Sequence, residues 1–158
     1  MAFQAFISSL KTGHLYKFIS PKVHPTIPHF FILLGHTDNY DKFIFNCCTS
    51  KFDKRYAHLT RQGLPYSTLV PIGKDMRIAL NFKLDDTCMD CNTPTLHTKG
   101  ELENIFNLCS PIEVRGTLDD SHIQQILKGT HESEMVDEWM KDIVPKDIDN
   151  ISPQLRVI

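Results

Sequence analysis

The chain has 158 residues and a formal net charge of −2, and its 41% apolar and 23% charged residues are typical of one globular domain. No apolar run reaches the roughly 20 residues of a membrane-spanning helix, and the N-terminal segment lacks the basic region of a signal peptide. Five cysteines, an odd count, indicate reduced thiols. We therefore expect a cytoplasmic protein that does not contact a membrane.

The charges are unevenly distributed along the sequence. Residues 1–62 contain eight Lys or Arg and three Asp or Glu, whereas residues 63–158 contain nine and sixteen. A basic region in an otherwise acidic protein favours a polyanion as partner. The alternative is that both signs mix on the folded surface, because sequence halves need not be spatial halves.

The predicted elements begin with a short helix, continue as strands and end as helices. Three prolines in residues 20–28 exclude a helix or a central strand there, so this segment is a long loop. Residues 51–66 read as a polar connection and 85–98 as an irregular segment. Gly129 is the expected end of the helix that precedes it. The expected elements are a helix over 3–10, strands over 13–19, 29–35, 42–49, 67–72, 77–82 and 111–118, a helical turn or two in 99–108, and helices over 119–129 and 133–144.

This order predicts a mainly β protein with C-terminal helices, an α+β domain built on a small antiparallel barrel. A parallel α/β sheet is disfavoured because the strands are short and the helices come late. The sequence contains neither a Gly-x-Gly-x-x-Gly motif nor a P-loop, so known dinucleotide and nucleotide phosphate sites have no support. No cofactor is expected.

Two cysteine pairs draw attention as metal or redox candidates. Cys88 and Cys91 form one Cys-x-x-Cys pair, but a structural zinc site needs about four ligands and the sequence holds no second such pair. Cys47 and Cys48 are adjacent on a predicted strand, so they point to opposite faces and only one could join such a site. We interpret them as plain reduced thiols, with Cys88 and Cys91 as weak zinc candidates.

Histidines and hydroxyls flank the strongest predicted hairpin. His24 lies in the proline-rich loop, and His29 ends that loop where the next strand begins. Histidine at such a position can move a proton near neutral pH. Thr49, Ser50 and Lys51 end the partner strand, and hydroxyls beside a lysine suit phosphate oxygens.

The order of segments resembles that of the MazF/PemK-like toxins of bacterial toxin–antitoxin pairs. The resemblance covers roughly residues 12–130, and the order of the pieces carries it. It implies a small SH3-like antiparallel β-barrel over 13–130, an N-terminal extension over 1–12 and a C-terminal helical extension and tail over 131–158. The matching pieces are Gly13-His14-Leu15-Tyr16, Pro28-His29-Phe30-Phe31-Ile32-Leu33, Phe43 to Ser50, Leu96 to Leu102, and Val114-Arg115-Gly116-Thr117-Leu118.

Members of this family cut single-stranded RNA without a metal, using an arginine at a strand mouth and a Thr or Ser at the end of the next strand. By position, these roles fall to His29, Thr49 and Ser50, so a histidine stands near the place of the arginine. The resemblance then implies attack by the RNA 2′-hydroxyl with His29 as acid or base, a homodimer and control by an antitoxin. The expected substrate-binding residues are Lys22, His24, Lys51, Lys54 and Arg55.

Two alternatives come from other functional classes. The first is a non-catalytic module on the same barrel, which binds a protein, as gyrase-poisoning relatives of the fold do, or binds nucleic acid without cutting. The second is a zinc-stabilised interaction domain that uses Cys88 and Cys91.

Overall fold

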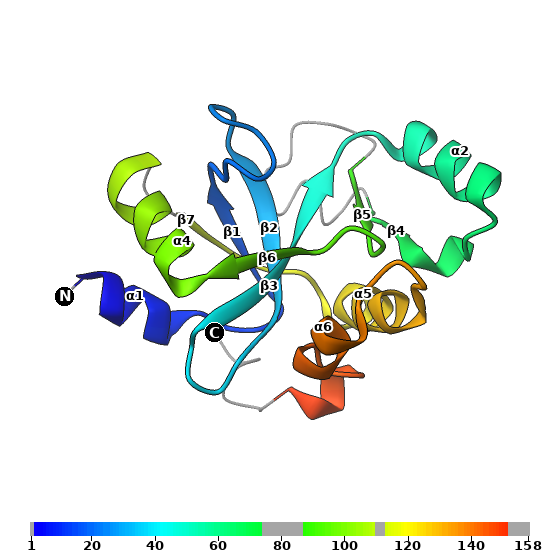
Figure 1. The fold of residues 1–158 in the computed structure, drawn as a ribbon. Coiled ribbons are helices and arrows are strands. Elements are labelled where there is room, and N and C mark those ends of the chain that lie inside the picture. The colour runs from blue at the N-terminus through cyan, green and yellow to red at the C-terminus, as the bar shows by residue number, and fades with distance from the viewer. Residues whose placement is uncertain (1, 74–86, 110–112, 152–158) are drawn as a thin grey trace.

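Figure 1 shows the computed structural model of the chain, which describes residues 2–73, 87–109 and 113–151. One antiparallel sheet curls into a half-barrel, and helices cover it on both sides. The strands are β1 (His14–Phe18), β2 (His29–His36), β3 (Lys42–Thr49), β4 (Leu69–Pro71), β5 (Cys88–Asp90), β6 (Thr95–Thr98) and β7 (Glu113–Thr117). The helices are α1 (Ala2–Ser9), α2 (Phe52–Gln62), α4 (Lys99–Asn104), α5 (Asp120–Glu132) and α6 (Glu138–Ile143), with short turns η1 (Tyr66–Thr68), η2 (Ile105–Cys109) and η3 (Ile148–Asn150).

Strands β1, β2 and β3 form the centre of the sheet, whose full order is β4-β5-β3-β2-β1-β7. The long strand β3 pairs with β6 along its first half and with β5 at its last two residues. All of these pairs are antiparallel. The α+β domain on a small antiparallel barrel that the sequence predicted is thereby confirmed.

Each face of the sheet carries its own core because side chains alternate along a strand. Along β2, Phe31 and Leu33 enter one core, whereas Ile32 and Leu34 enter the other. Helices α1 and α4 contribute buried side chains to the first core, and α5 contributes to the second. Fully burying one such side chain stabilises the fold by about 1.5–3 kcal/mol. The central strands are therefore buried on both faces, and polar chemistry is left to their ends.

Two glycines permit close packing of the C-terminal helices. A Cβ atom at Gly35 of β2 would lie 2.5 Å from the carbonyl oxygen of Ile143 in α6. A Cβ atom at Gly129 would lie 2.9 Å from both the Cys91 sulfur and the Ser67 carbonyl oxygen. The prediction that Gly129 ends the helix is wrong, since α5 continues to Glu132, and the glycine instead lets the helix approach Cys91 and Ser67 closely.

The polar connection predicted over 51–66 is also wrong, because α2 occupies most of it. Leu59 is the one buried residue of α2, so the helix shows little apolar periodicity. Gly63 ends it in the left-handed conformation, with φ of 66°. The irregular segment at 85–98 contains β5 and β6, and the second C-terminal helix is shorter than the predicted 133–144. The strand predicted over 77–82 lies outside the described residues.

The other expected elements agree with the structure. The N-terminal helix, the hairpin of β2 and β3, and the strand before α5 all lie within or close to the predicted ranges. Helix α4 begins with a capping box between Thr98 and Glu101. None of the helices in the described ranges has the length and apolar character that crossing a membrane requires.

Candidate functional site

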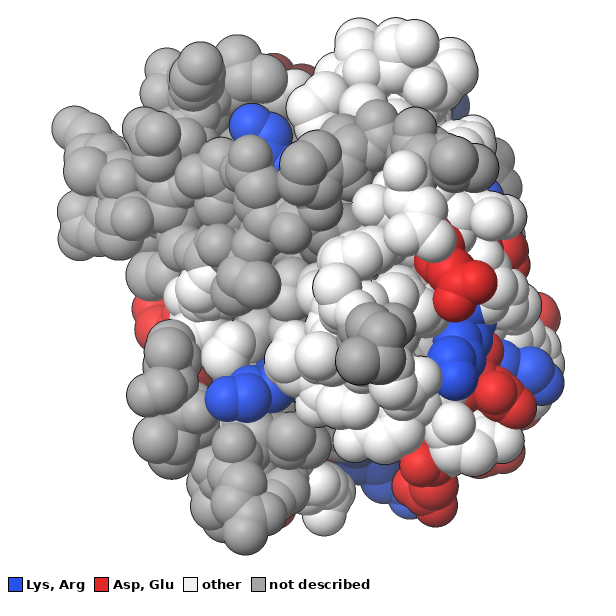
Figure 2. Space-filling view, turned by 90° about the vertical axis from the view of Figure 1, so that its left-hand side faces the viewer, with Lys and Arg blue, Asp and Glu red and all other residues white. Residues whose placement is uncertain are grey.

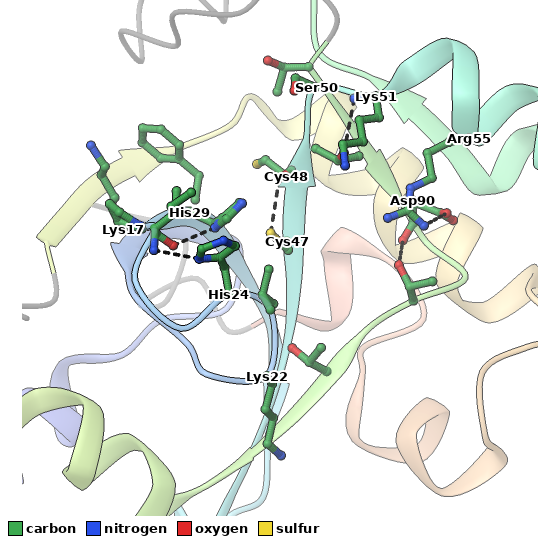
Figure 3. A pocket seen from close by; sticks show the side chains of 18 residues that line it. Lys17, Lys22, His24, His29, Cys47, Cys48, Ser50, Lys51, Arg55 and Asp90 are labelled. Carbon is green, nitrogen blue, oxygen red and sulfur yellow. Dashed lines mark hydrogen bonds and ion pairs between the residues drawn. The ribbon is translucent and has the colours of Figure 1, made fainter. Parts of the chain in front are cut away.

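A pocket of about 850 Å³ opens between the loop that joins β1 to β2 and the junction of β3 with α2 (Figure 3). Segments far apart in sequence meet here because β2 and β3 are antiparallel, so the start of β2 lies beside the end of β3. Of the residues that the sequence singled out, the pocket is lined by Lys22, His24, His29, Thr49, Ser50, Lys51 and Arg55. Lys54 is exposed on α2 and does not line it.

The β1–β2 loop, residues 19–28, is fixed to the sheet at its base. The Ser20 hydroxyl lies 2.8 Å from Nε2 of His97 in β6, and the Ser20 carbonyl accepts the backbone N–H groups of Val23 and His24. The Lys22 ammonium forms an ion pair with Glu101 at 2.8 Å and donates to the Leu96 carbonyl. Lys22 therefore anchors the loop, and Figure 3 shows its ammonium directed away from the two histidines.

His24 of the loop and His29 at the start of β2 lie side by side in the pocket, with ring centroids 6.5 Å apart (Figure 3). Nδ1 of His24 accepts the backbone N–H groups of Thr26 and Ile27, each at 3.1 Å. The proton of its neutral ring is therefore assigned to Nε2. Nδ1 of His29 instead donates to the Ile27 carbonyl at 3.0 Å, which leaves its Nε2 as a base when the ring is neutral. The two neutral histidines thus offer one donor, Nε2–H of His24, and one acceptor, Nε2 of His29, in the same pocket.

The opposite wall comes from the end of β3 and the start of α2. The Thr49 hydroxyl accepts the backbone N–H of Lys51 at 3.2 Å, which fixes the turn into the helix. Lys51 is the N-cap of α2 and provides no side-chain cap. The first N–H groups of a helix favour anions, and here Ser50 and Lys51 lie beside them. The Ser50 hydroxyl and the Lys51 ammonium of this corner can hold a phosphate.

Arg55 reaches the pocket one helical turn after Lys51, and a buried carboxylate orients it. Its guanidinium lies 3.4 Å from the carboxylate of Asp90, whose side chain is only 4% exposed. The other carboxylate oxygen of Asp90 accepts both the backbone and side-chain N–H groups of Asn92, each at 3.0 Å. The Asp90 carboxylate thus directs Arg55 along the pocket wall, and the guanidinium keeps further donors available.

The neighbouring thiols are held in their protonated form. Burial raises the pKa of Cys47 to about 12, although the positive charge of Arg55 opposes the shift. Burial also raises the pKa of Cys91 to about 12 and that of Cys48 well above its usual value. Cys47 packs with the first core and Cys48 with the second, as strand alternation predicted. A neutral thiol is a poor nucleophile and a poor metal ligand.

The zinc interpretation gains no support from the geometry. Cys88 packs with Leu59 and Leu69, whereas Cys91 belongs to the core beneath α5. Within the described ranges, no three His, Cys, Asp or Glu side chains are grouped as the ligands of a metal ion would be.

Sequence reasoning missed two charged residues of the pocket. Lys17 of β1 lines the pocket beside Phe30, the residue with which it pairs on β2, and its ammonium is 5.5 Å from the Phe30 ring. Asp90 was missed because the sequence predicted an irregular segment over 85–98. Its place between Cys88 and Cys91 was the available signal, since a charged side chain among buried residues is usually paired.

Basic side chains outnumber acidic ones in the pocket lining. The lining includes four Lys or Arg residues and one acid, Asp90; Arg55 is paired with this acid and Lys22 with Glu101, whereas no ion pair is found for Lys17 and Lys51 among the described residues. On the face in Figure 2, by contrast, the described Lys and Arg side chains lie singly or next to Asp and Glu. The mixing of charges expected as an alternative applies to that face, whereas Lys and Arg outnumber Asp and Glu in the pocket lining.

No protein-family model matches the sequence, and no curated protein is significantly similar to it.

Proposed function

We propose that the pocket binds a phosphodiester of single-stranded RNA and cleaves it without a metal, with His29 as the proton-transfer group. The observation that carries this proposal is the pairing of a histidine base with a fixed arginine and hydroxyls across one pocket. Nε2 of His29 is an acceptor, and Lys51, Arg55 and Thr49 line the opposite wall. Such a site can move a proton and stabilise an oxyanion at once.

The reaction follows from these positions. Nε2 of His29 accepts the proton of the ribose 2′-hydroxyl as that oxygen attacks phosphorus. The bond from phosphorus to the 5′-oxygen breaks, and this oxygen takes a proton from water, while His29 returns its proton to solvent. The products are a 2′,3′-cyclic phosphate and a 5′-hydroxyl. Arg55 and Lys51 stabilise the additional negative charge of the pentavalent phosphate, and Nε2–H of His24 donates to one of its oxygens.

The arginine that the resemblance leads us to expect at His29 has a substitute in Arg55. Arg55 comes from α2 rather than from β2, yet it lines the same pocket. A guanidinium held by Asp90 gives the fixed charge that a neutral histidine cannot. In this proposal the two tasks are divided, with proton transfer at His29 and charge stabilisation at Arg55.

The loop wall of the pocket is apolar and suits a nucleobase. Val23 and Ile27 are 37% and 52% exposed, and they line the pocket with Pro28 and Phe30. An apolar wall facing a cationic wall matches a nucleotide, whose base is flat and whose phosphate is charged. Control by an antitoxin and a homodimeric state remain part of the same proposal, and they rest on the resemblance alone.

Incubation of the purified protein with mixed-sequence single-stranded RNA in chelator tests the proposal. We expect cleavage by the wild type, and loss of at least 100-fold in rate for His29→Ala, since general acid–base catalysis contributes roughly 10²–10⁴-fold. Thr49→Ala and Arg55→Met should be slower than wild type. His58→Ala, which removes an exposed histidine of α2 outside the pocket, is the matched control. Intact RNA with wild type would refute the nuclease, and RNA bound but uncut would favour the non-catalytic module.

A further inference from the structure

Three aromatic side chains form a partly exposed stack on and beside α2, outside the pocket. Phe52 and Tyr56, one helical turn apart, have ring centroids 6.0 Å apart and an interplanar angle of 25°. Tyr66 of η1 stacks on Tyr56 at 4.8 Å and 9°. We call Phe52, Tyr56 and Tyr66 the aromatic stack. Only Phe52 packs against a buried cluster, which leaves Tyr56 45% and Tyr66 51% exposed.

The stack is held in place by the fold and is not a chance contact of mobile side chains. The Tyr66 hydroxyl lies 2.9 Å from the Thr60 hydroxyl, which itself donates to the Tyr56 carbonyl at 3.1 Å. Gly63 ends α2 so that the chain turns back and Tyr66 returns to the helix. Exposed aromatic rings that are fixed in advance lose little conformational entropy on binding. They therefore form a ready surface for a flat ligand.

The charges around the stack indicate which flat ligand it fits. Residues 51–62 contain four Lys or Arg and one acid, Asp53. Lys51 lines the pocket and directly precedes Phe52, and Tyr56 lies about 8 Å further along the helix axis. Aromatic faces beside cations are the means by which proteins hold single-stranded nucleic acid, with bases on the rings and phosphates on the cations.

We infer that the aromatic stack is a second subsite, which binds a base of the same RNA strand outside the cleavage pocket. This inference rests on the proposed function. The strand would pass from the pocket along α2, where Lys54 of the first turn and Arg61 of the last turn are available to its phosphates and Tyr66 offers its outer face to a base. Lys54 would thus bind RNA, although it does not line the pocket.

Binding of uncleavable RNA tests the inference separately from cleavage. The full chain is titrated with a fluorescent 12-nucleotide 2′-O-methyl RNA and with a trinucleotide that fills the pocket only. Stacking on an aromatic side chain contributes about 1–3 kcal/mol per base, so Tyr66→Ala should weaken 12-mer binding about 5- to 150-fold. Tyr66→Phe keeps the ring and should bind as the wild type does. Trp139→Ala is the control, since it removes an exposed aromatic ring on α6.

The outcomes separate the two proposals. Loss of 12-mer affinity in Tyr66→Ala with unchanged trinucleotide affinity supports the subsite, and Tyr56→Ala should act in the same way. Equal 12-mer affinity for wild type and Tyr66→Ala overturns it, and so does an equal loss for both ligands, which would indicate a change at the pocket. A wild type that binds neither RNA refutes the proposed function itself. Circular dichroism melting shows that each variant is folded.

Discussion

His97, which contacts the β1–β2 loop through Ser20, makes the stability of the fold depend on pH. Its ring is fully buried in contact with Phe18, Phe31 and Phe45, and its Nε2 lies 2.8 Å from the Ser20 hydroxyl. Burial, together with the nearby Lys22 ammonium, lowers its pKa from 6.5 to about 4, while Glu101 opposes the shift. The folded state therefore holds His97 neutral, whereas the unfolded chain takes up a proton near pH 6.5.

The sign and size of the effect follow from proton linkage. Because the unfolded state binds the extra proton, stability due to His97 is fully present above about pH 6.5 and is lost as the pH falls towards 4. A shift of this size gives the native protein between about 2 and 3 kcal/mol less stability at pH 4.5 than at pH 7. The group faces Lys22 and Glu101, whose ion pair has its own dependence on pH, so a matched variant is needed.

Urea unfolding of wild type and His97→Gln at both pH values measures this term. Glutamine keeps a donor near Ser20 and cannot titrate. We expect the difference in unfolding free energy between pH 7 and 4.5 to be about 2–3 kcal/mol larger for wild type than for His97→Gln. Equal pH dependence in the two proteins would show that burial does not hold His97 neutral in the folded protein.

Three further predictions concern packing, capping and thiols. Gly35→Ala should lower the free energy of unfolding in denaturant by about 1–3 kcal/mol, because its Cβ would meet the Ile143 carbonyl oxygen at 2.5 Å. Gly73→Ala, which has open space around it, is the control and should change the denaturant midpoint little. Thr98→Ala should cost about 1 kcal/mol in the same assay, because it removes the capping box of α4; an unchanged midpoint would argue against the cap. Burial raises the pKa of Cys47 to about 12, so its thiol should react with iodoacetamide at pH 8 far more slowly in the native than in the denatured protein. Peptide mass spectrometry follows the reaction, and equal rates in the two states would contradict the raised pKa.

Strong local patterns made the hairpin and the C-terminal helix predictable from sequence. Residues 29–35 and 42–49 are apolar runs of strand length around a polar turn, and both faces of the resulting strands are buried. Helix α5 shows its periodicity through Ile123, Ile126 and Leu127, all of which are buried. Apolar residues recur at strand or helix spacing in these segments because their side chains pack in the core.

The missed elements are those that tertiary contacts stabilise. Helix α2 buries little beyond Leu59 and instead exposes its aromatic stack, so no apolar stripe marks it. Strand β5 has three residues and exists because it pairs with the end of β3 and with β4. Such short strands carry no periodicity of their own.

The candidate site was predictable where it lies on the hairpin and not where it depends on distant segments. His29 and Thr49 were placed near each other by antiparallel pairing alone. The pairing of Arg55 with Asp90 joins residues 35 positions apart and needed the structure. The opposite tautomers of His24 and His29 likewise depend on the loop backbone around Ile27.

Analysis of the RNA ends tests the central claim most directly. Wild-type protein is incubated in chelator with an RNA of defined sequence and with the same RNA carrying 2′-deoxy sugars, and the products are identified by mass spectrometry. Attack by the 2′-hydroxyl predicts 2′,3′-cyclic phosphate and 5′-hydroxyl ends from the first RNA, no cut in the second, and loss of both products with His29→Ala. Intact RNA, 5′-phosphate ends or cleavage of the deoxy-substituted strand would contradict it.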